Sequence, residues 1–132
     1  MAFATPVLTP FTNVYGQRCL YVTVAGTAIA AATEATLTLG HQFLTLLRIE
    51  GQLTSGTATT IDPAFGAATN PAADRNILTN GTAAAQVDMI PSNGFKPIAS
   101  TTVAGIFYLR AVVDGGSADN VVAFQMYFRI GH

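Results

Sequence analysis

Few side chains in this sequence are of the types that carry out catalysis or bind metals. The chain has one cysteine, Cys19, and two histidines, His41 and His132, and they lack the spacing of zinc ligands. A single cysteine also excludes a disulfide within the chain. Cys19 lies in a strand-like run, which favours a buried and inert thiol over a nucleophile. The sequence therefore predicts no metal and no cofactor.

The segment DGGSADN, residues 114–120, comes nearest to a motif that carries chemistry. Its GGSAD part approaches the G-x-S-x-G pattern of a nucleophilic serine, but Asp119 stands where the second glycine belongs. Asp114, Asp119 and Asn120 offer oxygen atoms to calcium, but the closing glutamate of a known calcium loop is missing. The carboxylates that a glycosidase would pair are not grouped in the sequence. We interpret the segment as a solvated turn and expect that the protein is not an enzyme.

Two long apolar segments flank this turn, and their residues alternate between two faces. Because successive side chains of a strand point to opposite sides, residues 105–113 and 121–130 are predicted to be strands. The two glycines of the turn favour a hairpin between them. The predicted buried face consists of Phe107, Leu109, Val122, Phe124, Met126 and Phe128.

The opposite face of this predicted hairpin is too apolar for a surface that meets only water. It comprises Tyr108, Arg110, Val112, Val121, Gln125, Tyr127 and Arg129. Tyrosine and arginine are the residue types that anchor protein interfaces. We therefore predict that Tyr108, Arg110, Gln125, Tyr127 and Arg129 contact other subunits.

The first 16 residues contain Pro6 and Pro10 among apolar residues, which predicts an extended arm. The candidate contact residues of the arm are Phe3, Val7, Leu8 and Phe11. Two interpretations remain open, since such an arm lies either on a neighbouring subunit or along the edge of its own domain. The rest of the chain, residues 17–132, is predicted to be a single β domain.

Within this domain, residues 17–26 and 42–50 read as strands, the second ended by Gly51. Residues 25–40 read as a loop or one short helix followed by a strand, and residues 82–91 as a turn of helix followed by a strand. Several strands without a strong amphipathic helix predict an all-β fold, an antiparallel sandwich or barrel.

Residues 51–80 are rich in Gly, Thr, Ala, Asn and Pro and are predicted to form a long irregular loop. A loop of this length inside a compact domain is expected to bind something. Its one close pair of opposite charges, Asp74 and Arg75, is either a solvated pair or a contact at a subunit junction.

Charged residues make up 10% of the chain, against roughly 25% in ordinary soluble domains. A monomer with so few charges is prone to associate, so we expect much of the surface to be covered by other subunits. The net charge of −1 argues against a nucleic-acid partner. No apolar run is long enough to span a membrane, and the start of the chain does not read as a secretion signal.

The chain is small, is predicted to be all-β, and is rich in Ala, Thr and Gly but poor in charge. It also has a predicted apolar arm and a predicted long loop. In these features it resembles the small virion proteins of tailed bacteriophages. It is most similar to capsid decoration, or cement, proteins. The resemblance implies a homo-oligomer, with a trimer favoured, that binds the major capsid protein on the virion after assembly in the host cytoplasm. The alternative is a sandwich module of a phage tail or spike that recognises a carbohydrate or a receptor. Against this alternative, the chain has no Trp and four Tyr to build a sugar platform.

Overall fold

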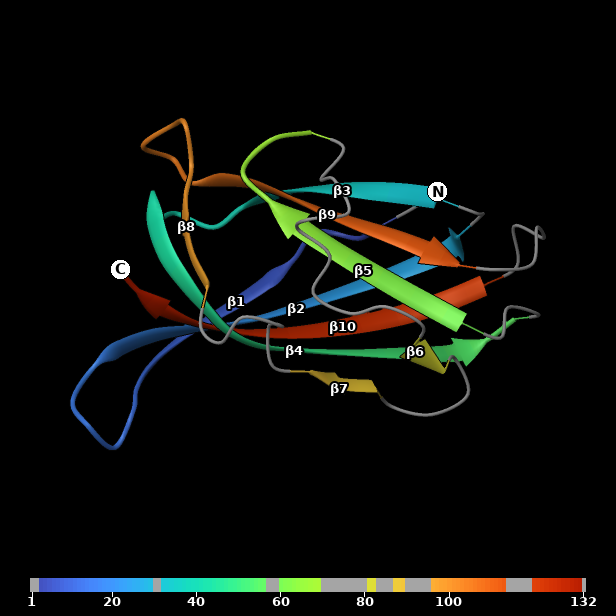
Figure 1. Ribbon diagram of the computed structural model, residues 1–132, viewed down its shortest axis with the longest axis horizontal. Coiled ribbons are helices and arrows are strands. Elements are labelled where there is room, and N and C mark those ends of the chain that lie inside the picture. Colours follow the sequence, from blue (N-terminus) through green and yellow to red (C-terminus); the bar gives the residue numbers. More distant parts are fainter. Residues whose placement is uncertain are drawn as a thin grey trace.

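The protein is an all-β sandwich of two antiparallel sheets (Figure 1), as seen in the computed structural model. The residues that the structure describes are 3–29, 32–56, 60–69, 81–82, 87–89, 96–113 and 120–131. The two sheets are separate layers and do not close into a barrel. Of the two predicted architectures, the sandwich is therefore the correct one.

The larger sheet has the strand order β1-β2-β10-β4-β7, and β8 also pairs with β4. Its strands are β1 (Val7–Thr12), β2 (Arg18–Ile29), β4 (Phe43–Ser55), β7 (Val87–Met89), β8 (Lys96–Ala99) and β10 (Asn120–Ile130). The register between β10 and β4 shifts where Tyr127 pairs with Arg48 and Phe128 with Leu46, so that Leu47 is an extra residue. Before this bulge the even-numbered residues of β4 point into the core, and after it the odd-numbered residues do. The alternation predicted over residues 42–50 is therefore interrupted at Leu47.

The smaller sheet has the strand order β3-β9-β5-β6. Its strands are β3 (Ala32–Thr38), β5 (Thr60–Gly66), β6 (Gly81–Thr82) and β9 (Ile106–Val113). The core lies between the two sheets and is lined by apolar side chains from both. Its largest fully buried side chains are Ile29, Leu37, Leu39, Leu44, Leu46, Ile49, Phe65, Phe107, Leu109, Phe124 and Phe128.

The predicted hairpin between residues 105–113 and 121–130 is wrong. β9 pairs with β3 and β5 in the smaller sheet, whereas β10 pairs with β2 and β4 in the larger one. The six residues predicted to form the buried face are nevertheless all buried. Alternation shows which side chains of a strand share a face, but it does not show which strand lies beside it. Two strands in opposite sheets of a sandwich have the same alternation of apolar residues as two strands that pair in one sheet.

Three other segment predictions also need correction. Gly51 does not end its strand: β4 continues to Ser55, and a Cβ at Gly51 would lie 2.9 Å from the ring of Phe124. The described part of residues 51–80 contains the end of β4 and all of β5, so it is not irregular. Residues 25–29 belong to β2 instead of a loop or helix, and β3 follows as the predicted strand. Within residues 82–91, β7 is a strand, and the predicted turn of helix lies outside the described residues.

The predicted arm contributes β1, which pairs antiparallel with β2 at the edge of the larger sheet. Before β1, Phe3 forms a bridge with Gly26, and the Ala4 amide donates to the Ala25 carbonyl at 2.8 Å. A side chain at position 26 would collide with the Phe3 ring, so the glycine makes room for it. Residues 3–12 thus lie along the edge of their own domain, one of the two arrangements that the sequence left open.

Candidate interaction surfaces

The residues considered for chemistry do not come together in the described part of the chain. There, no group of three or more His, Cys, Asp or Glu is placed to hold a metal. Cys19 is 1% exposed, and its thiol donates to the Gln17 carbonyl at 3.6 Å. Asn120, considered for calcium, is buried and donates from Nδ2 to the Ile29 carbonyl at 2.8 Å, which fastens β10 to β2. Asp114 and Asp119 lie outside the described residues.

Five contact residues were predicted on one face of the expected hairpin, and the structure divides them between the two outer sides of the sandwich. Tyr108 and Arg110 lie on β9 and face outward from the smaller sheet, whereas Gln125, Tyr127 and Arg129 lie on β10 and face outward from the larger sheet. All five are partly exposed. They therefore cannot form one contact surface within a single copy. The loop candidates Asp74 and Arg75 lie outside the described residues.

The outer side of the larger sheet is centred on a pair of tyrosines. Tyr127 lies opposite Tyr21 of β2, with ring centroids 4.8 Å apart and the ring planes tilted by 36°. On its other side Tyr127 lies opposite Arg48, whose Nη2 is 3.1 Å from Oε1 of Glu50. Burial raises the pKa of the Tyr127 hydroxyl, and the nearby Glu50 and Tyr21 raise it further. Tyr127 is therefore a neutral hydrogen-bonding group at neutral pH.

Strand β1 carries three of the four arm candidates and divides them between its two sides, and Phe3 precedes the strand. Val7 and Phe11 lie opposite Thr23 and Cys19, on the same outer side as the tyrosine pair. Leu8 lies opposite Val22, on the side that faces the smaller sheet. Phe3 packs against the core with its ring centroid 6.3 Å from that of Phe124. Val7, Leu8 and Phe11 remain exposed.

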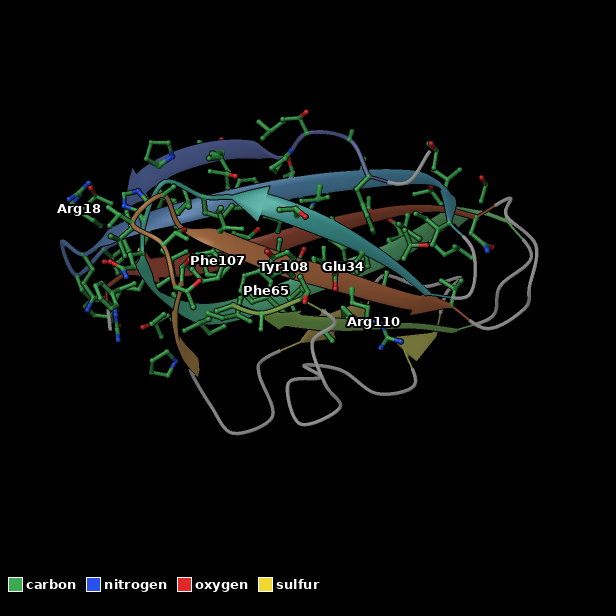
Figure 2. The ribbon with its side chains drawn as sticks, turned by 90° about the horizontal axis from the view of Figure 1, so that it is seen from above. Arg18, Glu34, Phe65, Phe107, Tyr108 and Arg110 are labelled. Atoms are coloured by element: carbon green, nitrogen blue, oxygen red, sulfur yellow. The ribbon has the colours of Figure 1, made fainter. Side chains whose placement is uncertain are left out.

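The outer side of the smaller sheet carries Arg110 opposite Glu34, and Tyr108 opposite Thr36. Figure 2 shows Glu34, Tyr108 and Arg110 on these neighbouring strands. An arginine across from a glutamate is a favourable cross-strand pair. Arg110 and Glu34 therefore carry opposite charges on adjacent strands of this side.

The most exposed large apolar side chains lie at one end of the sandwich. Val14 and Tyr15, in the turn between β1 and β2, are 93% and 84% exposed, and Val103, in the turn between β8 and β9, is 82% exposed. Both turns project from the end that also holds the C-terminus and the start of β4, where Phe43 is exposed (Figure 1). We call this region the projecting end and define it by Val14, Tyr15, Phe43 and Val103.

Side chains hold both turns of the projecting end in place. Asn13 Oδ1 accepts from the Tyr15 and Gln17 amides at 3.0 Å each, and Asn13 Nδ2 donates to Gln17 Oε1 at 2.9 Å. In the other turn, Ser100 Oγ donates to the Ile106 carbonyl at 2.9 Å and accepts from the Ile106 amide at 3.0 Å. The exposed apolar side chains are thus carried by turns with defined conformations.

The four residues of the projecting end were not among the contact residues predicted from the sequence. A signal for three of them, Val14, Tyr15 and Val103, is present in the segments TNVYGQ and STTVAG, where large apolar side chains stand inside polar, glycine-containing turns. A turn that meets only water has no need of a valine or a tyrosine at its tip. Phe43 has no such signal, because it reads as a regular strand residue.

In comparisons with known proteins, no family model and no curated protein matches this chain. Among the residues that the structure describes, no helix has the length and apolar character needed to cross a membrane.

Proposed function

We propose that this chain is a non-enzymatic structural protein of a virion, a decoration or cement protein that binds the outside of a phage head. It stabilises the head through contacts with the major capsid protein and with other copies of itself. The observation that carries this proposal is the projecting end, where Val14, Tyr15 and Val103 are almost fully exposed. Fully burying one such side chain contributes about 1.5 to 3 kcal/mol.

The fixed conformation of the two turns supports a role in binding. A loop that is ordered before it binds loses little conformational entropy on association, so that more of the burial energy appears as affinity. Asn13 and Ser100 provide this order through hydrogen bonds within the turns. The low charge of the whole chain adds to the argument, because sparsely charged surfaces are suited to contact with other subunits.

One observation favours a second candidate, a carbohydrate- or receptor-binding module of a tail or spike. Tyr15 presents an aromatic ring that is 84% exposed on an ordered turn, and sugar rings stack on such side chains. The neighbouring exposed residue, Val14, offers no hydrogen bonds to sugar hydroxyls. We therefore favour a protein partner.

The proposal is tested by mixing the purified chain with expanded heads built from the major capsid protein encoded in the same genome. We expect the chain to sediment with the heads and to occupy regular positions on their outer surface in cryo-electron micrographs. The double variant Tyr15→Asp, Val103→Asp should lose at least about tenfold in affinity, because two buried charges replace two apolar contacts.

Thr27→Asp is the matched control, since Thr27 is an exposed residue of β2 away from the projecting end. This variant should bind heads like the wild-type chain. Binding to tails in place of heads would support the second candidate. If the chain binds neither particle, or if the double variant binds as well as the control, the proposal is wrong.

A further inference from the structure

Strand β3 is the outermost strand of the smaller sheet, and over its whole length it pairs only with β9 among the described residues. Its seven residues pair with β9 without a register shift. No described residue pairs with the other side of β3, which is therefore an open edge in the described part of the chain. Open edges offer a row of backbone donors and acceptors to another strand.

The hydrogen-bond pattern shows which backbone groups of β3 face this open edge. The amide of Leu39, just after β3, donates to the carbonyl of Gly105 at 2.8 Å, so Leu39 directs its amide toward β9. Because this direction alternates along a strand, Leu37 also faces β9, whereas Thr36 and Thr38 direct their amide and carbonyl groups outward.

Four other edge strands of the described sheets, β1, β8, β6 and β7, are blocked by a proline or short. Beyond Ile61, β5 has no second partner strand among the described residues, but this stretch contains Pro63. On β1, the Asn13 amide donates to the Gln17 carbonyl at 3.0 Å, and alternation from this bond places Pro10 at an outward-facing position, where it removes a donor. On β8, the Ser100 amide donates to the Gln42 carbonyl at 2.8 Å, which places Pro97 in the same way. β6 and β7 have two and three residues. Prolines and short strands protect edges from pairing, and β3 has neither protection.

A groove of about 500 Å³ runs beside the open edge of β3. One wall is β3 itself, and the other is the segment before β1 together with the start of that strand. The lining residues are Phe3, Ala4, Thr5, Pro6, Leu8, Glu34, Ala35, Thr36 and Thr38. Figure 2 shows β3 on one side of this region and the N-terminal segment with β1 on the other. The groove therefore combines an open strand edge with an apolar wall.

We propose that the open edge of β3 pairs with β3 of a second copy, antiparallel and about a two-fold axis. Only an extended backbone matches a row of donors and acceptors at alternate residues, which makes another strand the fitting occupant. A second copy offers an edge of the same length. The pairing joins the two smaller sheets into one continuous sheet, and the second copy covers the exposed Leu8, which lines the groove.

The charges on β3 agree with this pairing. If the two-fold axis passes through Thr36, each Thr36 faces Thr36 of the other copy and each Glu34 faces Thr38 of the other copy. The two glutamates, the only charged residues of the strand, then do not face each other. In this register the two Thr36 residues exchange a pair of backbone hydrogen bonds.

The number of residues involved sets the expected strength. The proposed contact is centred on one strand of seven residues, whereas stable interfaces use about 20 to 30 residues on each side. We therefore expect a concentration-dependent dimer with a dissociation constant in the micromolar range or weaker. When the same strand edge of two copies pairs about a two-fold axis, both edges are occupied and no third copy can join. This contact therefore yields a dimer, whereas the resemblance to decoration proteins implied a trimer.

Sedimentation equilibrium of the purified chain tests this proposal without heads, so its outcome is independent of the proposed function. We expect the wild-type chain to shift from monomer to dimer between micromolar and millimolar concentrations. Thr36→Pro removes the outward-facing donor from both copies and should weaken the dimer by about tenfold or more, because two hydrogen bonds are lost. Thr12→Pro, which changes an outward-facing residue on the already blocked edge of β1, should dimerise like the wild type.

A charge exchange at the same position tests the register without a proline. Thr36 is exposed, so Thr36→Lys and Thr36→Glu are expected to fold. Each variant alone should dimerise about fivefold less well than the wild type, because like charges then face each other across the axis. An equimolar mixture should form a heterodimer at least as stable as the wild-type dimer. Gln52→Lys, exposed on β4, is the control and should have no effect.

Four results would overturn the proposal. They are a wild-type chain that stays monomeric at all concentrations, a trimer, a Thr36→Pro variant that dimerises like the wild type, and a Lys–Glu mixture that associates no better than either variant alone.

Discussion

The side chains on the two sides of strand β10 make contacts with different parts of the sandwich, although they alternate along a single segment. On the inner side, Phe124 and Phe128 are fully buried between the sheets. On the outer side, Gln125 and Tyr127 are partly exposed and contact neighbouring strands of the same sheet. The inner side therefore holds the two layers together, whereas the outer side contributes only within one layer.

The aromatic contacts illustrate this difference. Phe65 of the smaller sheet lies 5.5 Å from Phe107 of the same sheet and 5.4 Å from Phe128 of the larger sheet, measured between ring centroids. The labelled Phe65 and Phe107 lie in the interior in Figure 2. On the outer side, the Tyr21 and Tyr127 rings meet within one sheet. We expect that loss of an inner ring opens a cavity between layers, and that loss of an outer ring exposes surface to water.

The largest expected effect is that of Phe124→Ala. The ring of Phe124 packs over Gly51 and near Phe3, and its removal should lower the free energy of unfolding by about 3 to 5 kcal/mol. Urea unfolding followed by circular dichroism measures this change. Small domains are stable by about 5 to 15 kcal/mol, so this loss removes a large part of the stability of a domain near the lower end of that range. A loss below about 1 kcal/mol would mean that the inner side is not the core.

A smaller effect is expected for Tyr127→Ala. This variant loses the contact with the Tyr21 ring and should lower the free energy of unfolding by about 0.5 to 1.5 kcal/mol. Arg110→Ala, on the outer side of the smaller sheet, is expected to have a similarly small effect. The same urea titration measures both. If Tyr127→Ala destabilises the fold as much as Phe124→Ala, the proposed difference between the two sides of β10 is wrong.

The smallest effect concerns the pH dependence of stability. Burial raises the pKa of Tyr127 in the folded state above the value of about 10 in the unfolded chain. The folded protein thus keeps a proton that the unfolded chain loses, and the free energy of unfolding should fall as the pH rises from about 10 through the folded-state pKa. Below this range the contribution is constant.

Tyr127→Phe provides the control, because it keeps the ring and removes the titrating hydroxyl. Urea midpoints of the wild type and this variant, measured from neutral pH to above the tyrosine range, should differ in slope only at the alkaline end. A steeper alkaline loss in the variant than in the wild type would contradict the raised pKa.

The buried faces were the part of the fold that alternation predicted correctly. All six residues from Phe107 to Phe128 that were predicted to be buried are in the core, because parity depends only on the strand's own backbone. Strand pairing was not predictable in this way, and β9 and β10 proved to belong to different sheets. The predicted contact face was divided for the same reason, with Tyr108 on one side of the sandwich and Tyr127 on the other. Three of the four residues of the projecting end were missed because they lie in turns, where no periodicity marks exposure, and Phe43 was missed because it reads as a regular strand residue.

The sequence by itself determined that this protein is all-β, which residues of β9 and β10 are buried, and that few charges protect its surface. These properties follow from residue types and from the two-residue period of a strand, which are local. Only the tertiary structure decided which strands are neighbours, that the arm lies along β2, and that β3 is an open edge while Pro10 and Pro97 block others. These features depend on contacts between segments far apart in the chain, and the side-chain pattern of a strand does not depend on the identity of its neighbour.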